Sequence, residues 1–110
     1  MDKKIVLAEV LFESKDVFGK KVRITKVYWE KIKNEKHKEL KFGHKRVIEA
    51  LRDPDEVYLS VQDEFIRLFF KNIGNDTLVV LVKYLNGNGF VVTVYQTTKV
   101  KRKGEKLWPK

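Results

Sequence analysis

His37 is the residue of this chain best suited to acid–base chemistry. It is one of two histidines and lies in the lysine-rich stretch WEKIKNEKHKEL, residues 29–40. An imidazole titrates near neutral pH, and the neighbouring Lys33 and Lys36 disfavour a second positive charge and keep the ring neutral. Two interpretations follow: His37 exchanges a proton with an anionic substrate, or it is a solvated residue on a basic helix.

Four further polar residues lie in the strand-like second half of the chain. They are Arg67 in EFIRLFFKNI, Lys83 in TLVVLVKYL, and Thr93 and Tyr95 in GFVVTVYQTT. Successive side chains of a strand point to opposite faces of a sheet. The wholly apolar sets should face the helices, and they are Leu78, Val80 and Val82 in one strand and Phe90, Val92 and Val94 in the next. This arrangement leaves Lys83, Thr93 and Tyr95 together on the exposed face, and Arg67 joins them if its strand has the matching parity.

The hairpin between the last two strands decides this arrangement. Directly opposed residues of two paired strands lie on the same face of the sheet. The two apolar sets, which both have even residue numbers, are therefore opposed only if the loop between the strands contains an odd number of residues. We therefore expect Gly87-Asn88-Gly89 to form a three-residue loop with a glycine bulge, in place of a two-residue Asn-Gly turn. Under this register Lys83 and Thr93 lie on one face, and Val82 and Val94 lie on the other.

These exposed side chains suit a phosphodiester. Cations, a phenol and a hydroxyl can bind phosphate oxygens, stabilise a charged transition state and move a proton. Because a ribose supplies its own nucleophile, the 2′-hydroxyl, cleavage of RNA by such a site would require neither a metal nor another cofactor. Each of these residue types is also common singly on the solvated face of an antiparallel sheet.

The net charge of +9 is concentrated in two segments. Residues 15–46 contain 12 basic and 4 acidic residues, residues 47–98 contain 4 and 7, and residues 99–110 contain 6 and 1. Unmixed positive patches attract polyphosphate chains in a salt-dependent way. The residues expected to contact RNA are Lys33, Lys36, Lys99, Lys101, Arg102 and Lys103. The alternative is a lysine-rich surface that serves only solubility.

Length and composition indicate one domain, spanning residues 1–110. The chain has no cysteine and two histidines, which excludes disulfides and thiolate metal sites and argues against a histidine-rich metal cage. No apolar run is long enough for a membrane helix, and charges interrupt the amino-terminal segment where a signal peptide would need an apolar run. We therefore expect a cytoplasmic protein without a membrane partner.

Periodicity and turn residues predict an α+β fold. KIVLAEVLF and KKVRIT form a short hairpin, Thr25 caps a helix over KVYWEKIKNEKH, and a second helix in HKRVIEALRDPDE ends at Pro54. Four strands follow, in EVYLSV, EFIRLFFKNI, TLVVLVKYL and GFVVTVYQTT. We expect two helices in the N-terminal half, packed on one face of a four-stranded antiparallel sheet and preceded by the short N-terminal β hairpin. His44 is expected to pack at the start of the second helix.

Several motifs resemble a known nuclease group in their order and spacing. WEKI, HKEL, VIEALRDPDEV, FIRLFF, LVVLVKYL and GFVVTVYQT with a late Trp are similar to phage-type members of the barnase, EndoU, colicin and RelE-like nuclease superfamily. The resemblance implies a metal-independent ribonuclease, often a toxin. The catalytic residues that it marks are His37, Arg67, Thr93, Tyr95 and Lys83. One departure is Lys38, which stands where the family often has proline; a helix continuing through it would turn His37 away from the sheet.

Three functions from different classes are consistent with these observations. The first is a toxin-like endoribonuclease that cleaves RNA by 2′-hydroxyl transesterification. The second is a non-catalytic RNA-binding domain, and the third is a protein-interaction module that binds an acidic antitoxin or immunity protein. The first requires His37 or Tyr95 close to Arg67. The second requires basic patches without that cluster, and exposed aromatic residues on the sheet would favour it.

Overall fold

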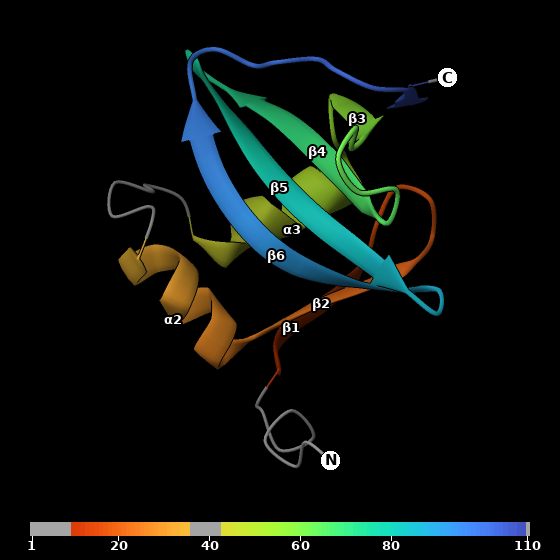
Figure 1. Ribbon diagram of the computed structural model, residues 1–110. Coiled ribbons are helices and arrows are strands. Elements are labelled where there is room, and N and C mark those ends of the chain that lie inside the picture. Colours follow the sequence, from red (N-terminus) through yellow and green to blue (C-terminus); the bar gives the residue numbers. More distant parts are fainter. Residues whose placement is uncertain (1–9, 36–42, 110) are drawn as a thin grey trace.

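The computed structural model describes residues 10–35 and 43–109, in which strands predominate and two short helices are formed (Figure 1). In chain order the elements are β1 (Val10–Lys15), β2 (Lys21–Thr25), α2 (Lys26–Glu35), α3 (His44–Arg52), β3 (Glu56–Leu59), β4 (Ile66–Ile73), β5 (Asp76–Leu85), β6 (Asn88–Thr97) and β7 (Lys106–Trp108).

The described strands form one seven-stranded mixed sheet in the order β1-β2-β6-β5-β4-β3-β7. Neighbouring strands are antiparallel except β2 and β6, which are parallel and pair Val22 with Gly89 and Arg23 with Phe90. The prediction of a four-stranded antiparallel sheet preceded by a separate hairpin is therefore wrong. The hairpin of β1 and β2 joins the sheet beside β6, and β7 adds a strand at the opposite edge.

These two additions depend on contacts between distant parts of the chain. β2 approaches β6 closely at Gly89, where a Cβ atom would lie 2.9 Å from Val22 Cγ2. At the other edge the Leu59 N–H donates a hydrogen bond to the carbonyl oxygen of Glu105 at 2.8 Å, and Val57 pairs with Trp108. Local periodicity carries no signal for such pairings, because the partner strands are not neighbours in the sequence.

We expect Gly89→Ala to lower the free energy of unfolding by about 1–3 kcal/mol, the usual cost of overpacking a filled site. The added methyl group would lie 2.8–2.9 Å from side-chain atoms of Val82, Tyr84 and Val22. Urea denaturation of parent and variant measures the change. Gly43→Ala is the matched control, because nothing lies within 4 Å of its Cβ position. Equal stability of the two variants would contradict the close approach of β2 to β6.

The predicted helix starts are confirmed. The Tyr28 N–H donates a hydrogen bond to Thr25 Oγ1 at 3.1 Å, so this threonine caps α2. α3 begins at His44 after an extended Gly43 and ends shortly before Pro54, whose ring cannot continue a helix. Within residues 10–35 and 43–109, no helix has the length and apolar character needed to cross a membrane.

The main core lies between the sheet and the helices. Trp29 of α2 and Leu51 of α3 pack in it together with Val80 and Val82 of β5. α3 lies behind the central strands in Figure 1, and we call the sheet face directed away from it the open face. A second, smaller apolar cluster covers part of the open face and consists of Tyr58, Leu68, Phe70, Val79, Leu81, Tyr95 and Val100.

The hairpin of β5 and β6 reaches the predicted parity by a different route. Its turn is the two-residue Asn86-Gly87, with φ angles of 55° and 83°, so the expected three-residue loop is wrong. Val82 pairs with Val91, but Leu81 pairs with Thr93, so β6 contains one extra residue. Beyond this β-bulge, residues with odd numbers in β5 are opposed to residues with odd numbers in β6, which is the pairing that we predicted.

The bulge also changes which residues of β6 face the helices. Val91 and Val94 are buried in the main core. Phe90, which we expected there, lies on the open face with 38% of its surface exposed.

Candidate functional site

The open face holds three of the five side chains predicted to be catalytic. Thr93 lies opposite Leu81, and Tyr95 lies opposite Val79. Lys83 lies two residues from Leu81 along β5 and therefore on the same face. This arrangement matches the predicted grouping of Lys83, Thr93 and Tyr95 on one side of the sheet.

Arg67 lies on the opposite face of the sheet. It pairs with the buried Val82, so its side chain is directed to the helix side. There its guanidinium carbon lies 4.8 Å from the ring centroids of both Phe18 and Tyr84. The expectation that Arg67 joins the open face is wrong. The turn Gly74-Asn75 has two residues, so odd-numbered residues of β4 are opposed to even-numbered residues of β5, which face the core.

The remaining predicted residues fall in the middle of the chain. His37 and Lys36 lie outside the described residues, as does the side chain of Lys33. Of the two expected pairs, Tyr95 with Arg67 is not formed, because these residues are on opposite faces of the sheet, and His37 with Arg67 involves a residue outside the described ones.

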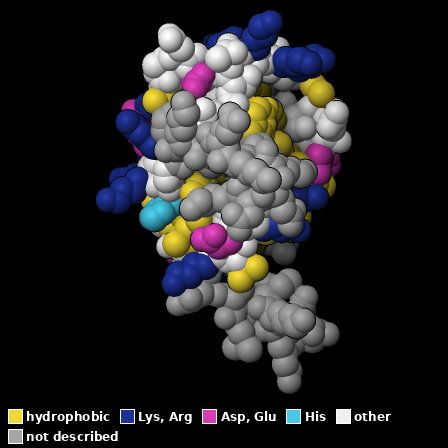
Figure 2. All heavy atoms as spheres, turned by 90° about the vertical axis from the view of Figure 1, so that its left-hand side faces the viewer, with side chains coloured by type: hydrophobic (Ala, Val, Ile, Leu, Met, Phe, Trp, Pro, Cys, Tyr) yellow, Lys and Arg dark blue, Asp and Glu magenta, His cyan; other side chains and the backbone are white. Residues whose placement is uncertain are grey.

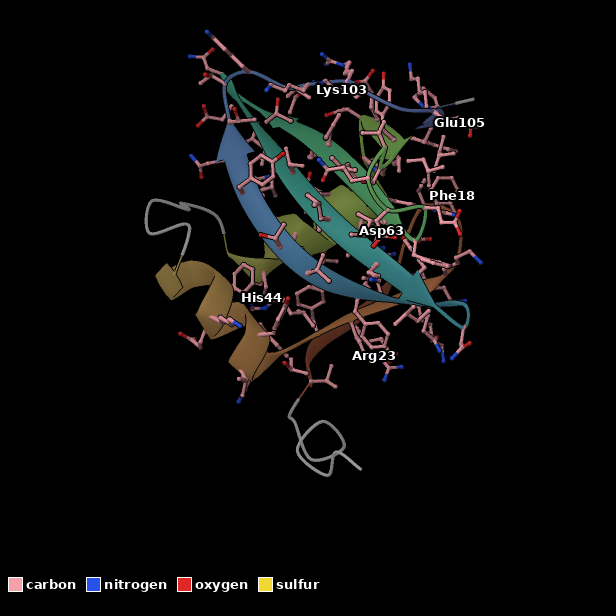
Figure 3. All side chains as sticks on the ribbon, in the orientation of Figure 1. Phe18, Arg23, His44, Asp63, Lys103 and Glu105 are labelled. Carbon is pink, nitrogen blue, oxygen red and sulfur yellow. The ribbon has the colours of Figure 1, made fainter. Side chains whose placement is uncertain are left out.

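The second histidine has a packing position. His44, labelled in Figure 3, is half-buried at the first residue of α3. Its ring stacks on Phe12 with a centroid separation of 6.0 Å and meets Trp29 edge-on at 6.5 Å. The expectation that His44 packs at a helix start is confirmed.

Aromatic rings occupy two parts of the open face. The rings of Tyr58 and Phe70 lie 5.6 Å apart within the smaller apolar cluster, and the half-buried Tyr95 belongs to the same cluster. Burial raises the pKa of Tyr95, so its phenol is neutral at neutral pH. Phe90 lies on the same face outside this cluster. Tyr58 and Phe70 are only 9% and 3% exposed, so the rings that a nucleobase can reach on this face are those of Tyr95 and Phe90.

The segment after β6 brings basic residues to the border of the open face. Val100 packs on the smaller apolar cluster, and Lys99, Lys101 and Lys103 are exposed around it. Lys and Arg side chains are visible at this upper end of the molecule in Figure 2, and Figure 3 labels Lys103 there. In the part of the chain that the structure describes, none of these three lysines forms an ion pair with a carboxylate.

Two of the other predicted cations have acidic partners. Arg102 Nε donates a hydrogen bond to Glu56 Oε1 at 2.6 Å, and Lys83 Nζ lies 3.2 Å from Asp63 Oδ2. A hydrogen bond from the Phe65 N–H, followed by the bond from Lys83, lowers the pKa of Asp63. Ion pairs of this exposed kind contribute little to stability, so a phosphate ligand can displace the carboxylate.

Sequence reasoning missed a buried polar cluster at the turn between β1 and β2. Asp16 is only 5% exposed. Its Oδ1 accepts hydrogen bonds from the N–H groups of Phe18 and Lys20 at 2.8 and 2.9 Å, and its Oδ2 accepts one from the Tyr84 hydroxyl at 2.5 Å. The available signal was an aspartate at the start of the turn SKDVFGK, whose Gly19 has a φ of 84°. This cluster holds the turn against the sheet.

We expect stability to fall as the pH rises above about 10, the ordinary pKa of tyrosine. Burial, and then the hydrogen bond to Asp16, raises the pKa of Tyr84. The folded protein therefore keeps this proton at a pH where the unfolded chain has lost it. The stabilisation is complete below the unfolded pKa and is lost as the pH rises through the folded pKa. Tyr84→Phe should flatten the fall, measured by urea denaturation across this range. The same slope in parent and variant would contradict the prediction.

In residues 10–35 and 43–109, no three His, Cys, Asp or Glu side chains are grouped so that they could hold a metal ion. The described residues instead form an apolar and aromatic sheet face with a basic border.

Comparison with known proteins gives no family for this chain, since no family model, curated protein or solved structure matches it.

Proposed function

We propose that this protein is a non-catalytic domain that binds single-stranded RNA on the open face of its sheet. The observation that carries the proposal is the border of that face, where Lys99, Lys101 and Lys103 lie beside the apolar and aromatic cluster without carboxylate partners among the described residues. Lysines attract the phosphates of the ligand, and aromatic side chains contact its bases.

A single strand fits this surface better than a duplex. Exposed bases are needed to stack on aromatic side chains, and a duplex keeps its bases paired and stacked inside the helix. Contacts of this kind tolerate many sequences, because every base has a planar face. We therefore expect little discrimination between RNA sequences.

Binding without cleavage is favoured by the positions of Arg67 and Tyr95. A cation that stabilises a phosphoryl transition state and the group that transfers the proton must reach the same phosphate. Arg67 and Tyr95 lie on opposite faces of the sheet, so these two side chains cannot reach the same phosphate.

Cleavage by a toxin-like ribonuclease stays a prediction with its own test. RNA would be incubated with the purified protein in chelator, and the RNA ends analysed. The proposal predicts intact RNA. Products with a 2′,3′-cyclic phosphate that disappear in His37→Ala would instead support an enzyme, and this substitution should then lower the rate by about 10²–10⁴.

The binding experiment is fluorescence anisotropy with a labelled single-stranded RNA across a salt series. Affinity should fall with salt, with a log–log slope of about −0.7 for each phosphate contacted. A duplex RNA of the same length should bind more weakly, and equal binding of single-stranded DNA would show that bases and phosphates, rather than the 2′-hydroxyl, are recognised.

Polyglutamate separates this proposal from the acidic-partner alternative. It offers negative charge without bases, so it should compete poorly with RNA for the open face. Competition as strong as that of unlabelled RNA would favour a protein partner such as an acidic antitoxin or immunity protein. RNA affinity that does not change with salt would contradict the proposed function.

A further inference from the structure

One row of paired residues crosses five adjacent strands at the end of the open face away from the lysine border. Its members, on β1, β2, β6, β5 and β4 in turn, are Glu13, Arg23, Phe90, Lys83 and Ile66. Their chain neighbours Val22, Gly89 and Val82 face the core, so alternation directs the row to the open face.

The centre of this row is an exposed aromatic ring between two cations. Phe90 is 38% exposed, so part of a planar side chain is accessible to a ligand at this point of the open face. The guanidinium carbon of Arg23 lies 5.7 Å from the centroid of the Phe90 ring, and Lys83 is the paired residue on the other side. β2 and the distant β5–β6 hairpin therefore bring a ring and two positive charges together.

Both cations retain capacity for a further acceptor. Arg23 Nη2 lies 3.3 Å from Glu13 Oε2, and 38% of the Arg23 side chain is exposed. Lys83 is held by Asp63 at 3.2 Å, with 38% of its side chain exposed. Both carboxylates form exposed ion pairs, which contribute little, so a phosphate can exchange for either of them.

We infer that Arg23, Phe90 and Lys83 form a nucleotide subsite, in which a base stacks on the Phe90 ring and the flanking phosphates contact Arg23 and Lys83. The inference rests on the proposed function, and it assigns a role to two residues, Arg23 and Phe90, that the sequence did not single out. Figure 3 places Arg23 at the lower end of the sheet and Lys103 at the upper end.

A single-stranded RNA that contacts both the Phe90 subsite and the lysine border must run along β6. The distance from Phe90 to Thr97 along a strand is about 23 Å, at about 3.3 Å per residue. Lengthening an oligonucleotide past this span should raise its affinity in one step, because only the longer ligand contacts both the subsite and the lysine border.

The test compares Phe90→Leu with Phe90→Tyr. Leucine keeps an apolar side chain but loses the planar face, so affinity for single-stranded RNA should fall about 5- to 150-fold, the usual effect of removing one stacking ring. Tyrosine keeps the face and should bind like the parent. Thermal unfolding of both variants shows whether the fold is retained.

An abasic oligonucleotide isolates the stacking contact. It has the phosphates but no base for Phe90, so the parent and Phe90→Leu should bind it equally. An equal loss for abasic and ordinary RNA would overturn the stacking role, since the substitution would then act through the shape of the surface.

The two cations are tested by their salt dependence. Arg23→Gln and Lys83→Gln should each flatten the log–log slope by about 0.7, the contribution of one phosphate contact. Arg52→Gln is the charge-matched control, because Arg52 is exposed on α3, behind the sheet.

The outcomes distinguish this inference from the proposed function. If the parent binds single-stranded RNA and Phe90→Leu binds as tightly, the subsite is wrong and the proposed function stands. If the parent does not bind single-stranded RNA, both are wrong.

Discussion

Replacing Lys99, Lys101 and Lys103 by glutamine should remove about 2 from the log–log salt slope of RNA binding, since each phosphate contact on a single strand contributes about 0.7. Between about 50 and 200 mM salt, the parent should therefore lose about 20-fold more affinity than the variant. We expect this large effect because the three lysines are exposed and form no ion pairs with described carboxylates. Anisotropy titrations at several salt concentrations measure both slopes.

A charge-matched variant controls for the loss of net charge. Lys31, Lys45 and Arg52 are exposed on α2 and α3, and their replacement by glutamine removes the same three charges. This variant should keep most of the parent slope. Equal slopes in the two triple variants would mean that RNA responds to overall charge, and would contradict binding at the lysine border.

Gly104→Ala tests the position of these lysines without changing a charge. Gly104 has a φ of 89°, and a Cβ atom there would collide with the carbonyl oxygen of Leu59. Alanine should therefore displace the segment from β3 and weaken RNA binding. RNA affinity equal to that of the parent would show that docking of this segment does not position the lysines.

Asp16→Ala should lower the free energy of unfolding by about 3 kcal/mol or more, because each buried donor left without a partner costs about 1–3 kcal/mol. The substitution removes the acceptor of two backbone N–H groups and of the Tyr84 hydroxyl, in a side chain that is 5% exposed. It also releases the turn that carries Phe18, on which Arg67 stacks. Urea denaturation at neutral pH measures the loss.

Asp16→Asn is the matched variant for this position. Its amide oxygen can still accept both backbone hydrogen bonds, and its NH₂ group can donate to the Tyr84 oxygen. The loss of stability should therefore be clearly smaller than for alanine. Similar losses for both variants would mean that the negative charge, rather than the hydrogen-bond pattern, stabilises the turn.

The Asp16 cluster and the open face should respond independently. Tyr84 and Arg67 lie on the helix side of the sheet, whereas Lys83 and Tyr95 lie on the open face. Because the sheet separates them, Asp16→Asn should leave RNA affinity unchanged. This comparison separates a folding role from a binding role.

Local chemistry explains the parts of the fold and site that could be predicted. Thr25 caps a helix by bonding a backbone N–H three residues away, and Pro54 prevents a helix from continuing. Side chains alternate between the two faces along β5 and β6. Together with the assumption that the apolar sets of both strands face the helices, this alternation placed Lys83, Thr93 and Tyr95 on one face. Each of these inferences depends on residues that are close in the chain.

The face of Arg67 could not be predicted in the same way. It depends on whether the turn between β4 and β5 has an even or an odd number of residues, and one residue reverses every side chain of the strand. The β5–β6 hairpin shows the same sensitivity, since a bulge beyond the Asn86-Gly87 turn compensates for the loop length.

The sequence by itself determined the helix starts, the central strands, the lysine-rich segment after them and the charge that favours an anionic ligand. Only the tertiary structure decided that β2 pairs with β6, and therefore that Arg23 lies over Phe90. The physical reason is that pairing of distant strands depends on the close approach of two backbones, here at Gly89 and Val22, and on the core that both strands share. No local propensity records that contact, so the nucleotide subsite exists only once the sheet is assembled.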